Sequence, residues 1–152
     1  MRGFGRFCRV LVVFVLAGSA TGCGSASRQV PEEAAESQML VNLAENYRMY
    51  SIAKKQPPRG LADLNAMQAM VGSEIEEVRR GNIIVQWGAK LPDISEEPGL
   101  VASPEVLAYW KDVPEKGGYV LMLDRTVKKM TPEEFRAAPK SGKEPAPAKA
   151  KR

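Results

Sequence analysis

Few residues of this chain have the side chains that covalent or acid–base chemistry requires. The 152 residues contain no histidine and two cysteines. Ser51 and Lys54 are three positions apart, a spacing that on a helix places an amine one turn from a hydroxyl that it could activate as a nucleophile. Three neighbouring carboxylates, Asp93, Glu96 and Glu97, could act as an acid–base pair or as calcium ligands.

The segment Ser51-Ile52-Ala53-Lys54 is similar to the Ser-x-x-Lys motif of penicillin-binding proteins and serine β-lactamases. The similarity ends there, because the downstream Ser-Asp-Asn and Lys-Thr-Gly elements of those enzymes are absent and the chain is too short for their fold. We interpret Ser51 and Lys54 as polar residues at the end of a helix. A serine enzyme that uses this pair is the remote alternative.

The carboxylates are better explained as part of a solvated linker. Two glycosidase carboxylates must face each other across a cleft, which residues adjacent on one loop rarely do, and calcium requires more oxygen ligands in a defined loop order. With no histidine, and no cysteine expected to remain free after processing, the usual zinc, copper and haem sites and the Cys-His and Ser-His-Asp arrangements are nearly excluded. We therefore expect a protein without catalytic residues, metal or dissociable cofactor.

The first 22 residues predict a signal peptide. Arg2, Arg6 and Arg9 give it a positive start, and the apolar run at 10–17 is too short to cross a bilayer, which takes about 20 residues. Small residues follow at 18–22, as a signal peptidase requires. The last of them lie directly before Cys23 and form the expected cleavage flank: Ala20, Thr21 and Gly22.

The segment Ala20-Thr21-Gly22-Cys23 resembles the lipobox of bacterial lipoproteins, with Ala20 where Leu, Val or Ile is usual. The resemblance implies cleavage before Cys23, diacylglycerol on its sulfur and an acyl chain on the new amino terminus. Cys8 falls in the removed segment, so Cys23 has no partner, and lipidation makes its sulfur inert in an oxidising compartment. We expect a secreted protein held on a membrane of the bacterial envelope by this lipid. The alternative is ordinary secretion with an incidental cysteine.

The remaining chain divides by composition. A short tether at 23–31, rich in Gly, Ser and Ala, precedes a single domain at 32–139, and a basic Pro/Ala/Lys tail occupies 140–152. The tail holds five basic residues against one acidic residue, and three more basic residues lie in the signal, so the domain itself carries about −3. The tail is expected to be extended, and either binds anionic wall polymer or lipid headgroups or is only a solubilising end. We expect no nucleic-acid partner, because the predicted compartment contains none.

Helical patterns come first in the domain. Apolar residues recur at helical spacing from Glu32 to Lys54, with acids near the start and Pro57-Pro58 after the end. A second helix is expected at 61–70. A third is expected at 74–80, with Ser73 and Glu76 forming a capping box and its charged residues forming a solvated face.

Strand patterns follow. β-branched and aromatic runs predict strands at 83–87, 106–111, 119–123 and 127–130, a turn at 114–118 and a short helix after Thr131-Pro132. The aromatic residues of these strands are expected to fill the core or cover its edge, and the alternation of Trp110 with Ala108 and Val106 favours its burial. The order predicts an α+β fold, in which a long N-terminal helix packs on a small antiparallel sheet of three or four strands, with short extra helices.

Two segments resemble bacterial pseudopilin-like proteins. Pro58-Arg59-Gly60-Leu61-Ala62-Asp63-Leu64 is similar to the connector after their long helix, and Gly117-Gly118-Tyr119-Val120-Leu121-Met122-Leu123-Asp124 with Val127 is similar to their closing hairpin. Both recur in small secreted proteins of planctomycete-type bacteria. Those relatives tend to have glycine where Arg125 stands, which implies a different turn here. Pseudopilins assemble through an apolar N-terminal helix, so the resemblance implies only the soluble part of their fold.

These observations lead to three hypotheses of function. The first is a non-enzymatic, lipid-anchored envelope protein with a structural or protein-interaction role. The second is a membrane-held module whose basic tail binds anionic wall polymer or lipid headgroups. The serine enzyme comes last.

Overall fold

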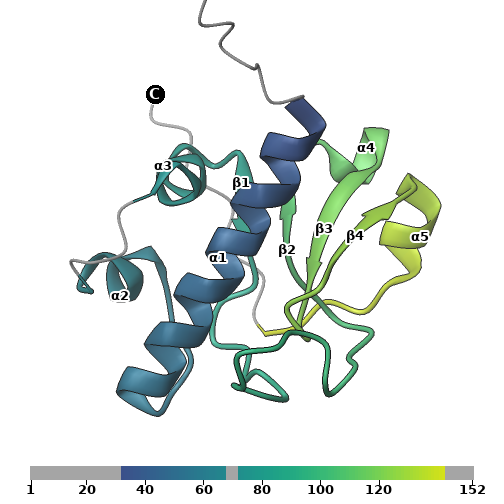
Figure 1. Ribbon diagram of the computed structural model, residues 1–152. Coiled ribbons are helices and arrows are strands. Elements are labelled where there is room, and N and C mark those ends of the chain that lie inside the picture. Colours follow the sequence, from purple (N-terminus) through teal and green to yellow (C-terminus); the bar gives the residue numbers. More distant parts are fainter. Residues whose placement is uncertain (1–31, 68–71, 143–152) are drawn as a thin grey trace, which may run out of the picture.

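The computed structural model describes residues 32–67 and 72–142. In chain order its elements are α1 (Glu32–Lys54), α2 (Leu61–Asn65), α3 (Ser73–Arg80), β1 (Ile83–Val85), β2 (Val106–Trp110), α4 (Val113–Lys116), β3 (Gly118–Met122), β4 (Val127–Met130) and α5 (Pro132–Ala137). The strands form one antiparallel sheet in the order β1-β2-β3-β4, and α1 crosses one of its faces (Figure 1). The predicted α+β fold is confirmed, with four strands.

The long helix spans the residues that its apolar stripe predicted. Its buried side chains are Leu40, Leu43, Ala44, Tyr47 and Tyr50. Glu32 and Glu33 in the first turn and Lys54 in the last complement the helix dipole. Lys55 then adopts φ 55°, a left-handed conformation that ends the helix before the two prolines.

The two short helices depart from their sequence patterns. The described part of α2 ends at Asn65, and residues 68–70 of the expected helix lie outside the described residues. The capping box expected in α3 does not form, because Gly72 is the N-cap and no side chain caps the helix. Glu74, expected on a solvated face, is buried instead, and its carboxylate accepts a hydrogen bond of 2.8 Å from the Asn46 amide.

A β-bulge in β2 divides the apolar residues between the two faces of the sheet. Val106 pairs with Met122 and Ala108 pairs with Leu121, so the register shifts by one residue between them. Leu107 and Ala108 consequently both pack in the cluster under α1, whereas Val106 packs in the cluster on the opposite face. The expected alternation of Val106, Ala108 and Trp110 on one face is therefore wrong, and Trp110 is half-buried and packs against both clusters.

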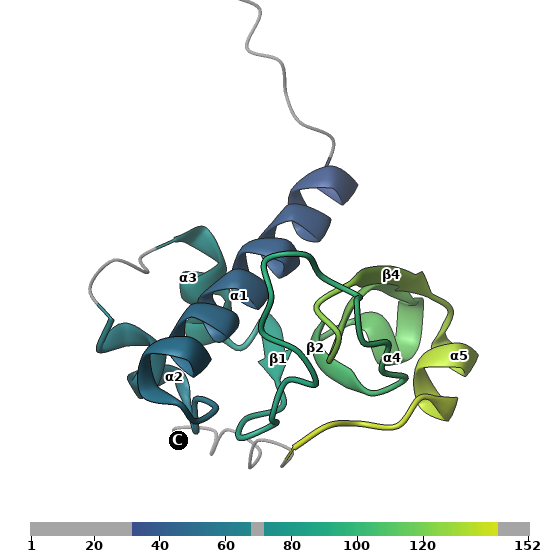
Figure 2. The ribbon, with the colours of Figure 1, turned by 60° about the horizontal axis from the view of Figure 1, so that its bottom comes forward.

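Each face of the sheet has its own core. The larger core lies between the sheet and the helices α1, α2 and α3, while α4 and α5 cover a smaller core on the other face (Figure 2). In that smaller core the rings of Tyr109 and Phe135 are 4.6 Å apart. The turn expected at 114–118 begins with one turn of helix, α4, and α5 has the capping box that its Thr131 and Glu134 can form.

The first residues of the expected tail belong to the fold. Lys140 forms a parallel bridge with Val106, and its ammonium donates to the carbonyls of Phe135 and Ala138. The Ser141 side chain is buried and donates to the Val106 carbonyl. An extended, solvated chain from residue 140 onward is therefore wrong for 140–142. Residues 143–152 of the tail lie outside the described residues, as do the predicted signal peptide, Cys23 and the tether.

Candidate functional site

The Ser-x-x-Lys pair lies at the C-terminal end of α1. The hydroxyl of Ser51 donates to the carbonyl of Tyr47, one turn earlier, at 2.8 Å, which is the usual way a helical serine satisfies its hydroxyl. Lys54 is exposed, and no hydrogen bond joins its amine to Ser51 within the described residues. The geometry therefore does not bring the two groups together as nucleophile and base.

Ser51 instead lines a pocket that opens at this end of α1, which we call the lysine pocket. It has a volume of about 520 Å³ and mostly apolar walls. Its lining residues are Ser51, Ile52, Lys55, Gln56, Pro57, Lys90, Leu91 and Ile94. They include no acidic side chain. Both the size and the apolar lining are typical of ligand sites.

Hydrogen bonds from α1 and the proline turn hold the walls of the lysine pocket in place. The buried hydroxyl of Tyr47 donates to the Ala89 carbonyl at 2.8 Å, and burial raises the pKa of this phenol well above its usual value, so it remains a donor. The Gly88 amide donates to the Pro58 carbonyl at 2.8 Å. These two bonds fix the segment at 88–94 against the helix end, although the two lie far apart in the sequence.

Arg48 adds a third link to the same segment. Its guanidinium donates to the Ile94 carbonyl at 3.1 Å and forms a two-pronged pair with Glu45, with contacts of 2.6 and 2.8 Å. The hydrogen bonds from Arg48 lower the pKa of Glu45, and those to Glu45 raise the pKa of Arg48. The charge of Arg48 is therefore neutralised within the protein. The positive charges of the pocket come from its lysines.

Within residues 32–67 and 72–142, the lysines around the pocket have no counter-ion. The ammonium groups of Lys54, Lys55 and Lys90 take part in no ion pair or hydrogen bond within the part of the chain that the structure describes. Two isoleucines beside them are unusually open, Ile52 with 40% and Ile94 with 50% of their surface exposed. Exposed apolar side chains next to unpaired cations mark this end of the molecule as a surface suited to binding.

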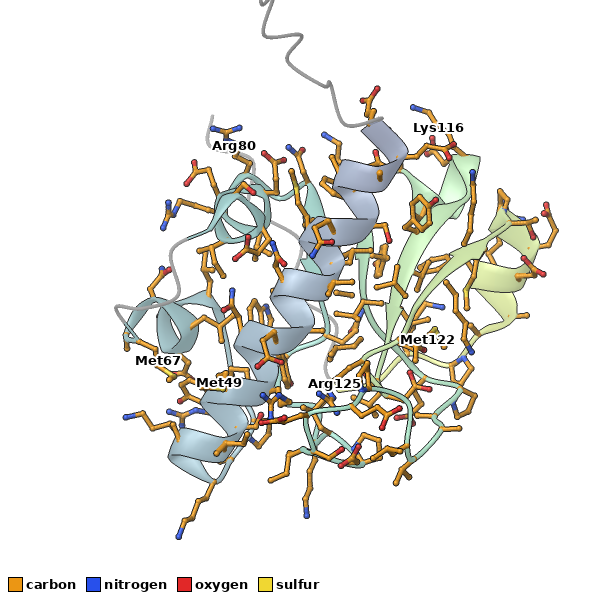
Figure 3. The ribbon with its side chains drawn as sticks, viewed as in Figure 1. Met49, Met67, Arg80, Lys116, Met122 and Arg125 are labelled. Atoms are coloured by element: carbon orange, nitrogen blue, oxygen red, sulfur yellow. The ribbon has the colours of Figure 1, made fainter. Side chains whose placement is uncertain are left out.

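Arg125, which lies in the β3–β4 hairpin, holds the loop that carries Ile94. This side chain is 4% exposed and donates to the Glu97 carbonyl at 2.9 Å and to Asp93 at 3.5 Å. Figure 3 shows Arg125 at the base of the sheet, beside the C-terminal half of α1. Arg125 adopts φ 68°, the left-handed conformation that glycine would favour.

Asp124 holds the other end of the same loop. Its carboxylate accepts hydrogen bonds from the Thr126 amide and hydroxyl and from the Ser103 amide, and its carbonyl accepts from Gly99. Burial raises the pKa of Asp124, but the hydrogen bonds from Thr126 and Ser103 outweigh it, so the net pKa is lowered. The carboxylate is therefore charged and structural.

The three carboxylates of the expected linker have different environments. Asp93 accepts hydrogen bonds from the amide and hydroxyl of Ser95, which lower its pKa, and Arg125 lowers it further. Glu96 and Glu97 are exposed. Among residues 32–67 and 72–142, no group of acidic or cysteine side chains is arranged to hold a metal ion. The interpretation of a purely solvated linker thus fails for Asp93, which helps to fix the loop.

A second pocket of about 610 Å³ lies at the other end of α1, and we call it the paired-charge pocket. It lies among the first turns of α1, the turn before β3 and the β4–α5 connection, and its lining includes Glu33, Glu36, Lys116, Tyr119 and Lys129. Lys129 contacts Glu33 at 3.0 Å and lies 5.6 Å from the centre of the Tyr119 ring. Lys116, at this end in Figure 3, contacts Asp112 at 2.9 Å.

The acidic side chains of the paired-charge pocket crowd one another. Partial burial raises the pKa of Glu36, and the nearby charges of Glu32 and Glu33 raise it further. The lysines here are thus used against carboxylates of the same protein. In contrast to the lysine pocket, the paired-charge pocket has no unpaired lysine among the residues that line it.

Sequence reasoning singled out Ser51 but missed the other parts of the lysine pocket. Lys90, Leu91 and Ile94 follow β1 in a stretch without a recognisable motif. The available signal was weak: an apolar and basic segment bounded by glycine and proline. Its proximity to the end of α1 depends on the fold.

Comparison of the chain with known protein families, with curated proteins and with solved structures finds no match. Among the described residues, no helix is both long and apolar enough to span a membrane.

Proposed function

We propose that this protein is a non-enzymatic protein of the bacterial cell envelope, anchored by lipid on Cys23, with a structural or protein-interaction role. The lipobox-like Ala20-Thr21-Gly22-Cys23 segment supports the anchor. The observation that carries the interaction role is the lysine pocket, where unpaired lysines adjoin exposed isoleucines. The side chains that could take part in catalysis have structural partners instead. The Ser51 hydroxyl, for example, donates to the Tyr47 carbonyl.

The length of α1 supports this arrangement. At 1.5 Å per residue, its 23 residues span about 34 Å. The helix begins nine residues after Cys23, and the lysine pocket lies at its other end. A lipid on Cys23 would tether the N-terminal end of α1 close to the membrane and allow the pocket to extend away from it.

Membrane fractionation of two matched cysteine variants tests the anchor. Cys23→Ser removes the sulfur that would carry the lipid, whereas Cys8→Ser changes a cysteine within the predicted signal peptide. We expect the wild type and Cys8→Ser to sediment with membranes and resist extraction at alkaline pH, and Cys23→Ser to be released. Equal partition of all three proteins would contradict the lipid anchor.

The tail hypothesis stays a prediction, because residues 143–152 lie outside the described residues. Lys140 is held by the Phe135 and Ala138 carbonyls, so it contributes to the fold. Deletion of residues 143–152 would test the hypothesis while sparing this contact. Unchanged retention on an anionic polymer would exclude a role for the tail in that binding.

A further inference from the structure

The walls of the lysine pocket select for an apolar ligand. Ile52, Pro57, Leu91 and Ile94 are the apolar residues of the lining, and Leu91 lies buried at 5% exposure. A hollow of about 520 Å³ is large enough for a small ligand and is within the range of ordinary ligand sites. Water in contact with these side chains would be released by an aliphatic chain, which favours binding.

The polar groups of the pocket select for an anion. Lys55 comes from the end of α1 and Lys90 from the segment after β1, so two independent elements place a cation in the lining. The carboxylates on the neighbouring segment do not neutralise them by contact: Asp93 is bound to Ser95 and Arg125, and the exposed Glu96 and Glu97 make no ion pair with either lysine. Because both lysines belong to the same lining, an anionic group in the pocket would be attracted by both positive charges.

We propose that the lysine pocket binds a single-chain amphiphile with an anionic head, of the fatty-acid class, whose chain lies on the isoleucine and leucine side chains and whose carboxylate contacts Lys55 and Lys90. The paired-charge pocket does not fit this ligand, because Glu33, Glu36 and Glu134 are in its lining and Glu33 already holds Lys129. The assignment rests on the interaction role proposed for the lysine pocket and names its ligand class, but it does not depend on the lipid anchor.

Titration with monomeric decanoate tests the proposal. The full chain carries Cys23→Ser, so that no acyl chain of its own competes, and decanoate stays below its micelle concentration. We expect amide shifts in the NMR spectrum at 51–56 and 90–94, and an affinity that falls about two- to fourfold for each methylene removed on going towards hexanoate. Decyltrimethylammonium, with the same chain and a cationic head, should bind at least tenfold more weakly.

Matched variants separate the contribution of the head from that of the chain. The double change Lys55→Gln/Lys90→Gln should weaken decanoate binding about five- to tenfold, with an effect that shrinks at high salt. Lys111→Gln/Lys128→Gln removes the same net charge from exposed positions elsewhere and should change the affinity less than twofold. Ile94→Ser should weaken decanoate and an uncharged decyl glycoside alike, because it acts on the chain.

Four results would overturn the proposal, and three of them come from the experiments with monomeric amphiphiles. They are amide shifts outside the pocket, equal binding of the cationic and anionic amphiphiles, and an equal loss of affinity in the two double-lysine variants. The fourth result comes from titrating the protein with phosphatidylglycerol vesicles. Binding to the vesicles without binding to monomeric decanoate would assign this surface to a membrane and would also overturn it. Release of Cys23→Ser from membranes has no bearing on these outcomes, so this proposal and the anchor can fail separately.

Discussion

The two ends of α1 carry pockets of similar size and opposite character. At the N-terminal end, Lys129 contacts Glu33 and Lys116 contacts Asp112, so the cations of the paired-charge pocket are neutralised within the protein. At the C-terminal end, Lys55 and Lys90 line a mostly apolar pocket that contains no acidic side chain. The difference indicates that charge at the first end serves the fold, whereas charge at the second remains for a ligand.

The contacts that support the two pockets also differ, in how deeply they are buried. The loop beside the lysine pocket is held by buried groups that include Tyr47, Arg125 and Asp124. The contacts at the paired-charge pocket are between exposed side chains, such as Lys129 and Glu33 at 59% and 69% exposure. Substitutions in the support of the lysine pocket should therefore cost more stability than substitutions in the ion pairs at the other end.

The largest effect is expected for Arg125→Ala. The change removes two hydrogen bonds that hold the loop at 92–104 and leaves alanine in a left-handed conformation, so we expect a loss of about 2–3 kcal/mol in the free energy of unfolding. Arg125→Gly loses the same bonds but relieves the backbone, so it should be more stable than Arg125→Ala by about 1 kcal/mol. Urea denaturation followed by circular dichroism measures both values.

Amide hydrogen exchange locates the damage from these two variants. Exchange should accelerate at 93–103 while the amides around Lys129 keep their protection. Wild-type stability of Arg125→Ala would show that the side chain does not secure the loop. Equal stability of the alanine and glycine variants would instead remove the argument from backbone strain.

Tyr47→Phe should have an intermediate effect. The ring stays packed, but the Ala89 carbonyl loses its buried hydrogen bond, so we expect a loss of about 1 kcal/mol. Tyr119→Phe is the matched control, since the Tyr119 hydroxyl has no hydrogen bond within the described residues and this ring lies at the other end of α1. Equal losses in the two variants, measured by urea denaturation, would contradict the role assigned to the Tyr47 hydroxyl.

A smaller effect should distinguish paired from unpaired lysines. Lys129→Gln breaks the contact with Glu33 and is expected to lower the melting temperature by no more than about 4 °C at low salt, with the difference shrinking at high salt. Lys90→Gln removes a lysine without a counter-ion and should leave the melting temperature unchanged or slightly higher. If both variants are destabilised to the same extent, the contrast between the two ends does not hold.

Local patterns were sufficient to predict the main elements of this fold. The apolar stripe of α1 and the β-branched runs of the strands are repeated signals, and each makes the local preference agree with the final packing. The bulge at Leu107 and Ala108 was not predicted, because one extra residue reverses the faces without changing the composition of the strand. The burial of Glu74 was not predicted for a related reason, since its partner Asn46 is 28 positions away in the sequence.

The candidate site was less accessible from the sequence than the fold. Ser51 attracted notice through its spacing from Lys54, yet the pocket is completed by Lys55 and by Lys90, whose segment is held against the end of α1 by the long-range Tyr47 and Gly88 hydrogen bonds. Likewise, Arg125 adopts a left-handed backbone conformation that glycine would favour, and its side chain makes contacts that help to offset this strain. Such long-range compensation has no local sequence signal.

The smallest effects concern pH, and they should have opposite signs at the two ends. The pKa of Glu36 is raised in the folded protein, so above the ordinary value of 4.5 the unfolded chain releases its proton more readily and folding stability falls as pH rises through the folded pKa. Glu36→Gln should remove this decline and raise the melting temperature at pH 7 by less than about 3 °C.

The pKa of Asp93 is lowered, so its contribution to folding stability is present above 3.8 and is lost as pH falls through the folded pKa. Asp93→Asn should therefore lower stability at pH 7. Melting curves from pH 2 to 7 measure both slopes. Slopes of the same sign would show that the crowding of acids around Glu36 and the pairing of Asp93 do not differ as the structure indicates.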